Sequence, residues 1–304
     1  MPRKQRIEYP GAVYHVISRG NYRKDLFVHD KTGEAFERTI FEAAGRCGWK
    51  LYAYVIMSNH YHLVIETPEP NLVEGMKWLQ STFATRFNRF RNERGHVFQG
   101  RYKSILINED RPLLGLIDYV HLNPVRAKLC SIDELKDHTL SSFPKYFKRS
   151  RQAPLDRTTL LSLCELPDTQ GGMRKYLERL KLVDQGCPRK CGALAKQYCR
   201  GWFLGSAEAK KALAKDIAEK TPMIDWEGVD LKELNENNWE QIVKAEMKRL
   251  KKKESDIESS PKGADWKVSI AKRLRKESTA KNPWIAKRLR MGHPNYVSNL
   301  VNQS

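Results

Sequence analysis

The 304-residue sequence has no apolar run of the roughly 20 residues that a helix needs to cross a bilayer. Its first residues, Met-Pro-Arg-Lys-Gln, are basic, and no apolar segment follows them, which argues against a secretory signal. We therefore expect a cytoplasmic protein with no membrane partner. Because hydrophobic residues make up 40% of the chain, a folded core is still within reach.

The CxxC spacing of many zinc sites is also missing. Three of the six cysteines, Cys187, Cys191 and Cys199, lie close together in the sequence, but no fourth ligand is obvious. A cytosolic chain keeps such thiols reduced. Ordinary buried or surface thiols therefore explain the cluster better than a structural zinc site, which stays open as the alternative.

Acidic residues are scarce relative to basic ones. The chain holds 55 Lys and Arg against 36 Asp and Glu, a net charge of +19. Residues 241–304 contribute +10 of this charge, with 16 basic against 6 acidic side chains. Phosphate contacts dominate nucleic-acid affinity, so a polyanion is the expected partner. The alternative is a solvated basic surface that maintains solubility.

The first half of the chain predicts an α+β fold, an antiparallel sheet flanked by helices. Apolar residues alternate with polar ones where strands are expected and recur at helical spacing elsewhere. Ser58-Asn59 is short enough to join two strands in a hairpin. The predicted order is strand 10–18, helix 31–46, strands 49–57 and 60–66, helix 71–92, strand 104–108 and helix 111–123, closing by about residue 150.

The second half predicts an all-α region. Residues 170–219 and 239–253 look helical, whereas 221–238 resemble an acidic loop and 254–265 a flexible linker. We therefore expect three parts, which are a catalytic domain at 1–150, a helical accessory region at 151–238 and a basic helical region at 239–304.

Two histidines in the segment His60-Tyr61-His62 carry the first chemical signal. Alternate residues of a strand face the same side, so His60 and His62 can share one cation. A divalent ion held there can grip a phosphate oxygen and stabilise charge on a leaving oxygen. A purely structural pair packed on the sheet is the competing explanation.

The second signal is Tyr119 and Asn123, which are four residues apart and share one face of the predicted helix. Asn123 could give a carbonyl oxygen to the metal, with Tyr119 about one turn away near a bound phosphate. Pro124 biases Asn123 away from helical geometry and places it at the helix end. The alternatives are a helix C-cap for Asn123 and a half-buried core aromatic for Tyr119.

Tyr119 would act as a nucleophile on phosphorus. Free tyrosine has a pKa of about 10, and a nearby cation lowers the cost of forming the phenolate. Attack gives a covalent phosphotyrosine that conserves the energy of the broken bond. Of the other candidates, Tyr61 faces the opposite side of the sheet from the histidines, and Tyr102 could stack on a base.

The segments Met57–Val64 and Asp118-Tyr-Val-His-Leu-Asn-Pro-Val-Arg-Ala-Lys-Leu129 together resemble the single-tyrosine HUH transposases, in particular the REP-associated tyrosine transposases. Residues 12–21 and 97–103 fit the same pattern, and the resemblance covers roughly residues 5–150. It implies His60, His62 and Asn123 as ligands of Mg²⁺ or Mn²⁺, and Tyr119 as nucleophile. It also implies single-stranded DNA as substrate, often with a hairpin beside the cut.

Several polar and basic residues are candidates for DNA contacts, although each could equally be a solvated surface residue. In the predicted catalytic domain they are Arg19, Asn21, Arg101, Lys103 and Arg126. The helix at 71–92 adds Arg86, Arg89 and Arg91, interleaved with Phe87 and Phe90, which would suit a groove that follows a single strand.

Residues 282–301 predict a helix-turn-helix. Asn282 is the expected N-cap with Pro283 at the first helical position, Gly292 lies in the turn, and Pro294 begins the second helix. The turn is one residue longer than usual, and a small helical hairpin that only packs is the alternative. The residues expected to face duplex DNA are Asn295, Tyr296, Ser298 and Asn299.

The sequence thus favours a metal-dependent DNA strand transferase acting at REP-like hairpins, as a monomer or homodimer. The second hypothesis is a catalytically silent, transposase-derived regulator that binds DNA. A third is a hydrolase in which water attacks and no covalent intermediate forms.

Overall fold

The computed structural model describes residues 6–28, 31–148, 154–186, 198–220 and 232–302. Residues Glu8–Ser206 form one compact unit, here named the sheet unit, and the residues from Ala207 onward belong to a second, named the helical unit. None of the described helices is long and apolar enough to span a membrane.

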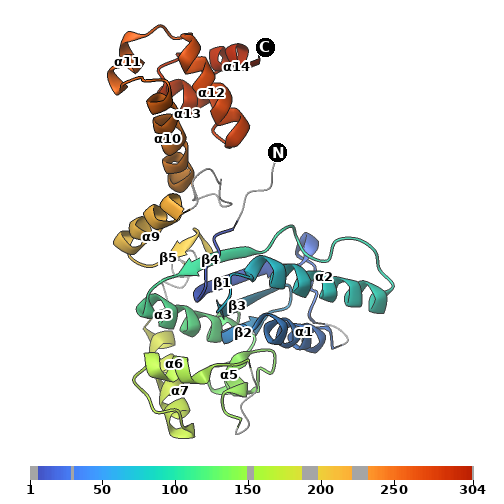
Figure 1. The fold of residues 1–304 in the computed structure, drawn as a ribbon. Helices are drawn as coiled ribbons and strands as arrows, with labels where there is room; N and C mark the ends of the chain where they lie inside the picture. The colour runs from blue at the N-terminus through green and yellow to red at the C-terminus, as the bar shows by residue number, and fades with distance from the viewer. Residues whose placement is uncertain (1–5, 29–30, 149–153, 187–197, 221–231, 303–304) are drawn as a thin grey trace. The chain divides into compact units, whose positions relative to one another are not determined.

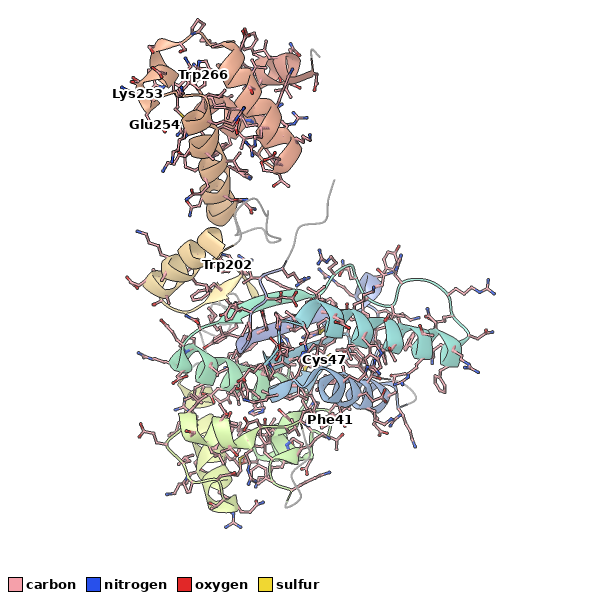
Figure 2. The ribbon with its side chains drawn as sticks, viewed as in Figure 1. Phe41, Cys47, Trp202, Lys253, Glu254 and Trp266 are labelled. Atoms are coloured by element: carbon pink, nitrogen blue, oxygen red, sulfur yellow. The ribbon has the colours of Figure 1, made fainter. Side chains whose placement is uncertain are left out.

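The sheet unit is built on a five-stranded sheet with the order β2-β3-β1-β4-β5 (Figure 1). β1 to β4 pair antiparallel, whereas β5 adds to β4 in parallel. Ser58 and Asn59 join β2 to β3, as the hairpin prediction required. The strands are β1 (Ala12–Arg19), β2 (Lys50–Ile56), β3 (His60–Thr67), β4 (Lys103–Ile107) and β5 (Phe203–Leu204).

Two helices, α1 (Thr32–Cys47) and α2 (Leu72–Arg91), lie side by side (Figure 1) and pack on one side of the sheet. An aromatic cluster fills the space beneath them. The Tyr61 ring of β3 lies 4.7 Å from that of Phe36, which in turn lies 4.8 Å from Phe83. Tyr61 therefore faces away from the strand face that carries His60 and His62, because strand side chains alternate.

The opposite face packs against α3 (Asp110–His121) and later helices, which are α5 (Ser142–Lys145), α6 (Arg157–Leu163) and α7 (Gln170–Gln185). Two short segments connect α3 to α5, namely α4 (Asn123–Arg126) and the 3-10 helix η2 (Asp133–Asp137). Burying this second apolar face accounts for the folding of residues well past 150. The predicted closure near residue 150 is therefore wrong for the sheet, because β5 extends it from residues 203–204.

The helical unit is all α, as predicted. Its apolar core includes Trp239, Ile270, Leu274, Ile285 and Val297. Its helices are α9 (Ala207–Lys220), α10 (Lys232–Arg249), α11 (Glu254–Ser259), α12 (Asp265–Glu277), α13 (Asn282–Arg288) and α14 (Pro294–Asn302).

Two segments of this unit are more helical than predicted. Within the expected acidic loop 221–238, α10 begins at Lys232, and within the expected linker 254–265, α11 spans Glu254–Ser259. The Asp256 carboxylate accepts a hydrogen bond from the Lys253 backbone N–H at 2.7 Å, which caps this short helix. Ile257 is buried in the core, so packing stabilises a helix whose sequence is polar.

The predicted α+β fold class is confirmed, and in the first half of the chain, up to α3, the strand and helix bounds lie within about two residues of those expected from the sequence. One cap differs, since Lys281 occupies the N-cap of α13 and Asn282 is already helical. The predicted division at residues 150 and 238 into three functional parts stays a prediction.

Candidate active site

His60 and His62 project from the start of β3 towards the face covered by α3. Antiparallel pairing with β1 sets Arg19 opposite His60 and Ile17 opposite His62. The two imidazole centroids are 5.2 Å apart and nearly perpendicular. His62 is only 2% exposed, whereas His60 is partly accessible. The strand therefore brings the two rings together, as the His-x-His spacing predicts.

Hydrogen bonds define which ring nitrogen of each histidine is free. His60 Nδ1 donates to the amide oxygen of Asn59 at 2.8 Å. His15 Nδ1 donates to the backbone carbonyl of Tyr198 at 2.9 Å, since a carbonyl can only accept. A neutral His15 then accepts at Nε2 from His62 Nδ1, 2.8 Å away. Both His60 and His62 consequently keep an unprotonated Nε2.

Burial keeps these rings uncharged. It lowers the pKa of both His15 and His60 to about 4, and nearby Arg19 lowers that of His60 further. The pKa of His62 lies well below its usual value, chiefly through burial and then through the neighbouring histidines. Near neutral pH all three are therefore neutral imidazoles, the form that binds metal ions.

Tyr119 comes from α3 and lies against the histidines. Its ring centroid is 5.8 Å from that of His62 and 6.5 Å from that of His15, edge to face in both cases. The Arg126 guanidinium lies 5.2 Å from the Tyr119 ring centroid. This packing agrees with Tyr119 as a site residue and equally with its alternative as a core aromatic, because the side chain is only 6% exposed.

The Tyr119 hydroxyl is covered by the segment that leads into β5. It lies 3.4 Å from Cys199 Sγ, and its ring lies 5.1 Å from the Tyr198 ring. Burial, more than Cys199, raises the Tyr119 pKa, while Asn123 and Arg126 partly lower it. The phenolate is therefore disfavoured in the conformation described.

Asn123 is the first residue of α4, after Leu122 has ended α3. Its side-chain Nδ2 donates to the Tyr119 backbone carbonyl at 3.0 Å. This contact leaves the amide oxygen of Asn123 as an available ligand and brings the side chain to Tyr119. Leu122, and not Asn123, is the C-cap of α3.

The donor set fits a divalent cation such as Mg²⁺ or Mn²⁺. Neutral imidazoles with unprotonated Nε2 atoms are common metal ligands, and amide oxygens suit Mg²⁺ and Mn²⁺. Both histidines also have Nδ1 hydrogen bonds of the kind that orient metal-binding imidazoles. Among the described residues no group of three or more His, Cys, Asp and Glu side chains could hold a metal ion, so the set depends on Asn123 or on a ligand from solvent or substrate.

Residues 9–123 match the model of the IS200-like transposases. A protein of Haemophilus influenzae described as a REP-associated tyrosine transposase is 27% identical over 107 residues, which are 32% of this chain and 60% of the relative. The chain thus spans about three-fifths of that relative's length. The predicted transposase resemblance is confirmed at the level of the family.

Two solved structures are also similar in part. One is titled as a REP-associated tyrosine transposase bound to a REP hairpin, with 16% identity, a TM-score of 0.41, and coverage of 52% of this chain and 96% of the other. The second, from Deinococcus radiodurans and described as a transposase, has 21% identity, a TM-score of 0.29, and coverage of 37% and 91%.

The predicted DNA-contact residues of the sheet unit lie at differing distances from the candidate site. Lys103 Nζ donates to the Cys199 carbonyl at 2.8 Å, and Arg126 covers Tyr119. Arg19 and Arg101 are exposed, and Asn21 lies in the 3-10 helix η1 (Asn21–Arg23) directly after β1. Arg19, Lys103 and Arg126 thus lie near the site.

Two other expectations for DNA contact are changed by burial and pairing. Tyr102, considered as a base-stacking residue, is buried. On α2, Arg86 pairs with Glu42 at 2.9 Å and Phe87 is buried, whereas Phe90 is exposed. The proposed groove along this helix therefore retains fewer free side chains than the sequence indicates.

The four residues expected to contact duplex DNA lie on α14 in the helical unit. Asn295, Tyr296 and Asn299 are exposed and Ser298 is partly exposed. Val297, on the other side of the helix, is buried against the core.

Sequence reasoning missed three residues that surround Tyr119, namely His15, Tyr198 and Cys199. His15 shares a strand face with Val13 and Ile17, both of which pack on the core. A histidine between apolar residues on one strand face could have signalled a buried role. Tyr198 and Cys199 gave no such signal, since they meet the site only through the pairing of β5 with β4. Of the other clustered cysteines, Cys187 and Cys191 lie outside the described residues.

Proposed function

We propose that this chain is a metal-dependent DNA strand transferase that cuts and rejoins single-stranded DNA with Tyr119 as nucleophile. The observation that carries the proposal is the position of Tyr119, edge-on to His62 at 5.8 Å, beside two histidines that each keep a free Nε2. A tyrosine next to a cation site can attack a phosphate that the cation also binds.

In the proposed reaction the Tyr119 oxygen attacks phosphorus and the bond from phosphorus to the 3′ oxygen breaks. The phenol loses its proton and the departing 3′ oxygen gains one, which leaves a 5′-phosphotyrosine and a free 3′ hydroxyl. The reverse step uses a 3′ hydroxyl from another strand end, which restores a phosphodiester and releases Tyr119. The number of phosphoester bonds is unchanged, so no ATP is required.

His60, His62 and Asn123 would hold the cation, whose chemistry is to offset negative charge on the phosphate during transfer. The protein's own part is to keep both imidazoles neutral by burial and to orient them through Asn59 and His15. Arg126 over the Tyr119 ring and Arg19 opposite His60 add positive charge that favours a bound phosphate.

DNA must displace the cover on Tyr119 before it can react. The hydroxyl is occupied by Cys199 and the ring by Tyr198. Lys103, which now donates to the Cys199 carbonyl, would be released for a phosphate when this segment moves.

Hairpin DNA of the REP type is the proposed substrate, acted on by a monomer or a homodimer. Support comes from the Haemophilus influenzae relative, whose description associates it with REP sequences, and from the basic character of the chain. A net positive charge draws polyanions at a rate that falls with added salt.

The test is a covalent-adduct assay. The full chain is mixed with Mn²⁺ and single-stranded hairpin DNA labelled 3′ of the expected cut, and the protein is resolved on a denaturing gel. We expect a labelled adduct with the wild type, and none with Tyr119→Phe. Tyr61→Phe is the matched control, because Tyr61 is a buried tyrosine on the opposite sheet face, and it should form the adduct.

Each competing hypothesis has its own outcome. Binding without cleavage by the wild type would support the silent regulator. Cleavage that persists in Tyr119→Phe, with no adduct in either protein, would support hydrolysis by water and overturn the proposal.

We further propose that α13 and α14 form a helix-turn-helix that contacts duplex DNA. The supporting observation is the two-sided character of α14, where Val297 is buried while Asn295, Tyr296 and Asn299 are exposed. Short polar side chains on an exposed helix can read base edges in the major groove. A gel-shift titration with hairpin duplexes, comparing wild type with Asn295→Ala and Asn299→Ala, tests this. Unchanged affinity in both variants would contradict it.

A further inference from the structure

We infer that His15 is a positioning residue for the metal ligand His62, and that it sets the affinity of the site for its cation. The inference rests on the proposed function, since it assigns His62 to a metal. His15 lies on β1 and contacts His62 at Nδ1, the ring nitrogen that would not bind the cation.

The geometry is a relay of two hydrogen bonds across the His15 ring. The Tyr198 carbonyl accepts from His15 Nδ1 at 2.9 Å, and His15 Nε2 accepts from His62 Nδ1 at 2.8 Å. The two rings are stacked, with centroids 5.1 Å apart and planes 22° from parallel. The backbone carbonyl thus determines the His15 tautomer, and His15 in turn determines that of His62.

This relay determines the protonation of the second ring nitrogen of His62, Nε2. Because its Nδ1 carries the proton that it donates to His15, its Nε2 carries a lone pair. Without an acceptor at His15, the His62 proton could move to Nε2 and the ring could rotate about its side-chain bonds. Either change removes the lone pair from the direction that a cation requires.

Because both rings are buried, losing either hydrogen bond of the relay would be costly. His15 and His62 are almost fully inaccessible, so a lost hydrogen bond would not be replaced by water. An unsatisfied buried donor destabilises the folded protein. An apolar residue would fill this place on β1 more cheaply, and yet a histidine stands between Val13 and Ile17. A specific hydrogen-bonding demand from His62 explains that residue.

The relay can be tested by replacing His15 with residues that do or do not reproduce it. The glutamine in His15→Gln can accept from His62 through its side-chain oxygen, whereas the leucine in His15→Leu cannot. His121→Leu is the matched control, because His121 is an equally buried histidine in α3 that bonds to Tyr176 and Ser142 instead. Thermal unfolding is recorded for every variant.

The readout is Mn²⁺ binding by the full chain without DNA, followed by electron paramagnetic resonance. We expect His15→Leu to bind about 10–100-fold more weakly, as for other groups that orient a metal-binding histidine. His15→Gln should recover most of that loss, and folded His121→Leu should bind as the wild type does. High Mn²⁺ should restore adduct formation in His15→Leu, which a general structural defect would not allow.

Two results would overturn the inference. One is wild-type Mn²⁺ affinity in His15→Leu, and the other is equal weakening in His15→Gln and His15→Leu. Mn²⁺ binding by a wild type that forms no DNA adduct would instead contradict only the proposed reaction. Wild-type protein that binds no Mn²⁺ would contradict both.

A second observation, independent of the histidines, points to a base-binding residue. Tyr22 is 93% exposed, and both Tyr22 and Arg23 have positive φ angles, 53° and 58°. Such backbone geometry is uncommon for large side chains and persists only where surrounding contacts enforce it. We propose that Tyr22 stacks on a nucleobase of the single strand near the cut.

The backbone around Tyr22 is held at the same hairpin that carries His60. Gly20 N–H donates to the Asn59 carbonyl, and Asn21 N–H donates to the Val97 carbonyl, both at 2.8 Å. The ring is thus presented to solvent by a fixed turn next to the site and beside the cationic Arg23. Exposed aromatic rings with flanking basic residues are the usual means of binding single strands.

Affinity for a labelled single-stranded oligonucleotide tests this second proposal. Tyr22→Ala should weaken binding about 5–100-fold, the range for loss of one stacked base, while Tyr22→Phe stays close to wild type. An abasic site at the stacked position should abolish the difference between wild type and Tyr22→Ala. Equal affinity of wild type and Tyr22→Ala would overturn the proposal.

Discussion

The sheet unit and the helical unit both bury polar side chains, but among the described residues only the sheet unit buries histidines. They are His15, His62 and His121, and burial lowers the pKa of each. The helical unit buries charged Glu246 and Lys267 as well as two asparagines, and the sheet unit also buries charged Asp118, which pairs with Arg179. Glu246 is 1% exposed and is paired with Arg249 and Arg273, while Lys267 donates to two backbone carbonyls.

This difference separates residues that hold a fold together from residues that can still react. A buried glutamate with two arginine partners has no bonding capacity left, so its contribution is to the structure. A neutral imidazole with one nitrogen bonded keeps a lone pair on the other. In His121 both nitrogens have partners, whereas His62 has a partner at Nδ1 only.

The largest expected effect comes from removing that free lone pair. His62→Ala should weaken Mn²⁺ binding by well over about 100-fold, since losing a ligand exceeds losing a group that orients one, and should abolish the DNA adduct. His121→Ala should lower the melting temperature but leave Mn²⁺ affinity unchanged in the folded protein. Isothermal titration calorimetry measures the Mn²⁺ affinity of both variants, and thermal unfolding measures their melting temperatures. Equal loss of Mn²⁺ affinity in the two variants would remove the distinction between the histidines.

Breaking the buried ion pairs of the helical unit should affect stability alone. Arg273→Ala leaves Glu246 buried with Arg249 as its remaining partner. We expect a loss of about 2 kcal/mol, less than for a fully buried pair because Arg273 is partly exposed. Denaturant unfolding followed by the fluorescence of Trp239 and Trp284, whose rings lie 5.2 Å apart in this core, measures it. Loss of Mn²⁺-dependent cleavage in this variant would contradict the assignment of chemistry to the sheet unit.

A smaller effect should follow from the exposed face of α14. Tyr296→Ala should weaken duplex binding by about 5–30-fold, equivalent to about 1–2 kcal/mol and typical of a single base contact. Gel-shift titrations at two salt concentrations measure it. Cleavage of single-stranded DNA should not change, and a parallel loss of both activities would argue against separate roles for the two units.

The smallest effect is expected at the cover on the nucleophile. Cys199→Ala removes the contact with the Tyr119 hydroxyl and also lessens burial. Both changes lower the Tyr119 pKa towards its ordinary value, because burial and Cys199 raise it. The initial rate of adduct formation should rise about two- to fivefold, as for one modest hydrogen bond. A decreased rate would mean that Cys199 supports the reactive position of Tyr119.

Much of the fold could be predicted because its signals are local. The alternation in β1 and β3, the turn Ser58-Asn59 and the helical spacing of α1 to α3 all reflect the immediate sequence. The short elements α11 and β5 could not be predicted. Ile257 stabilises α11 by joining a core formed from distant helices, and β5 is two residues that form a strand only because β4 offers an open edge.

The candidate site also has features that the sequence could predict and features that only the structure shows. His60 and His62, two apart on a strand, and Tyr119 and Asn123, four apart near a helix end, could be selected from spacing and family resemblance. Their mutual contact, in contrast, depends on α3 crossing the β3 face. Asn123 is the clearest case, because Pro124 indicated a helix end while only the structure places its amide on the Tyr119 carbonyl.

The sequence alone determined the chemistry available to this protein, which is a pair of same-face histidines, a tyrosine and an excess of positive charge. The tertiary structure decided the state of those groups. Burial and hydrogen bonding across β1 and β3 keep His62 neutral with an unprotonated Nε2, and the segment before β5 brings Tyr198 and Cys199 over Tyr119. The protonation of these side chains and their exposure depend on neighbours that are distant in the chain. The spacing of residues in the sequence could therefore identify the candidate site residues but not their protonation or burial.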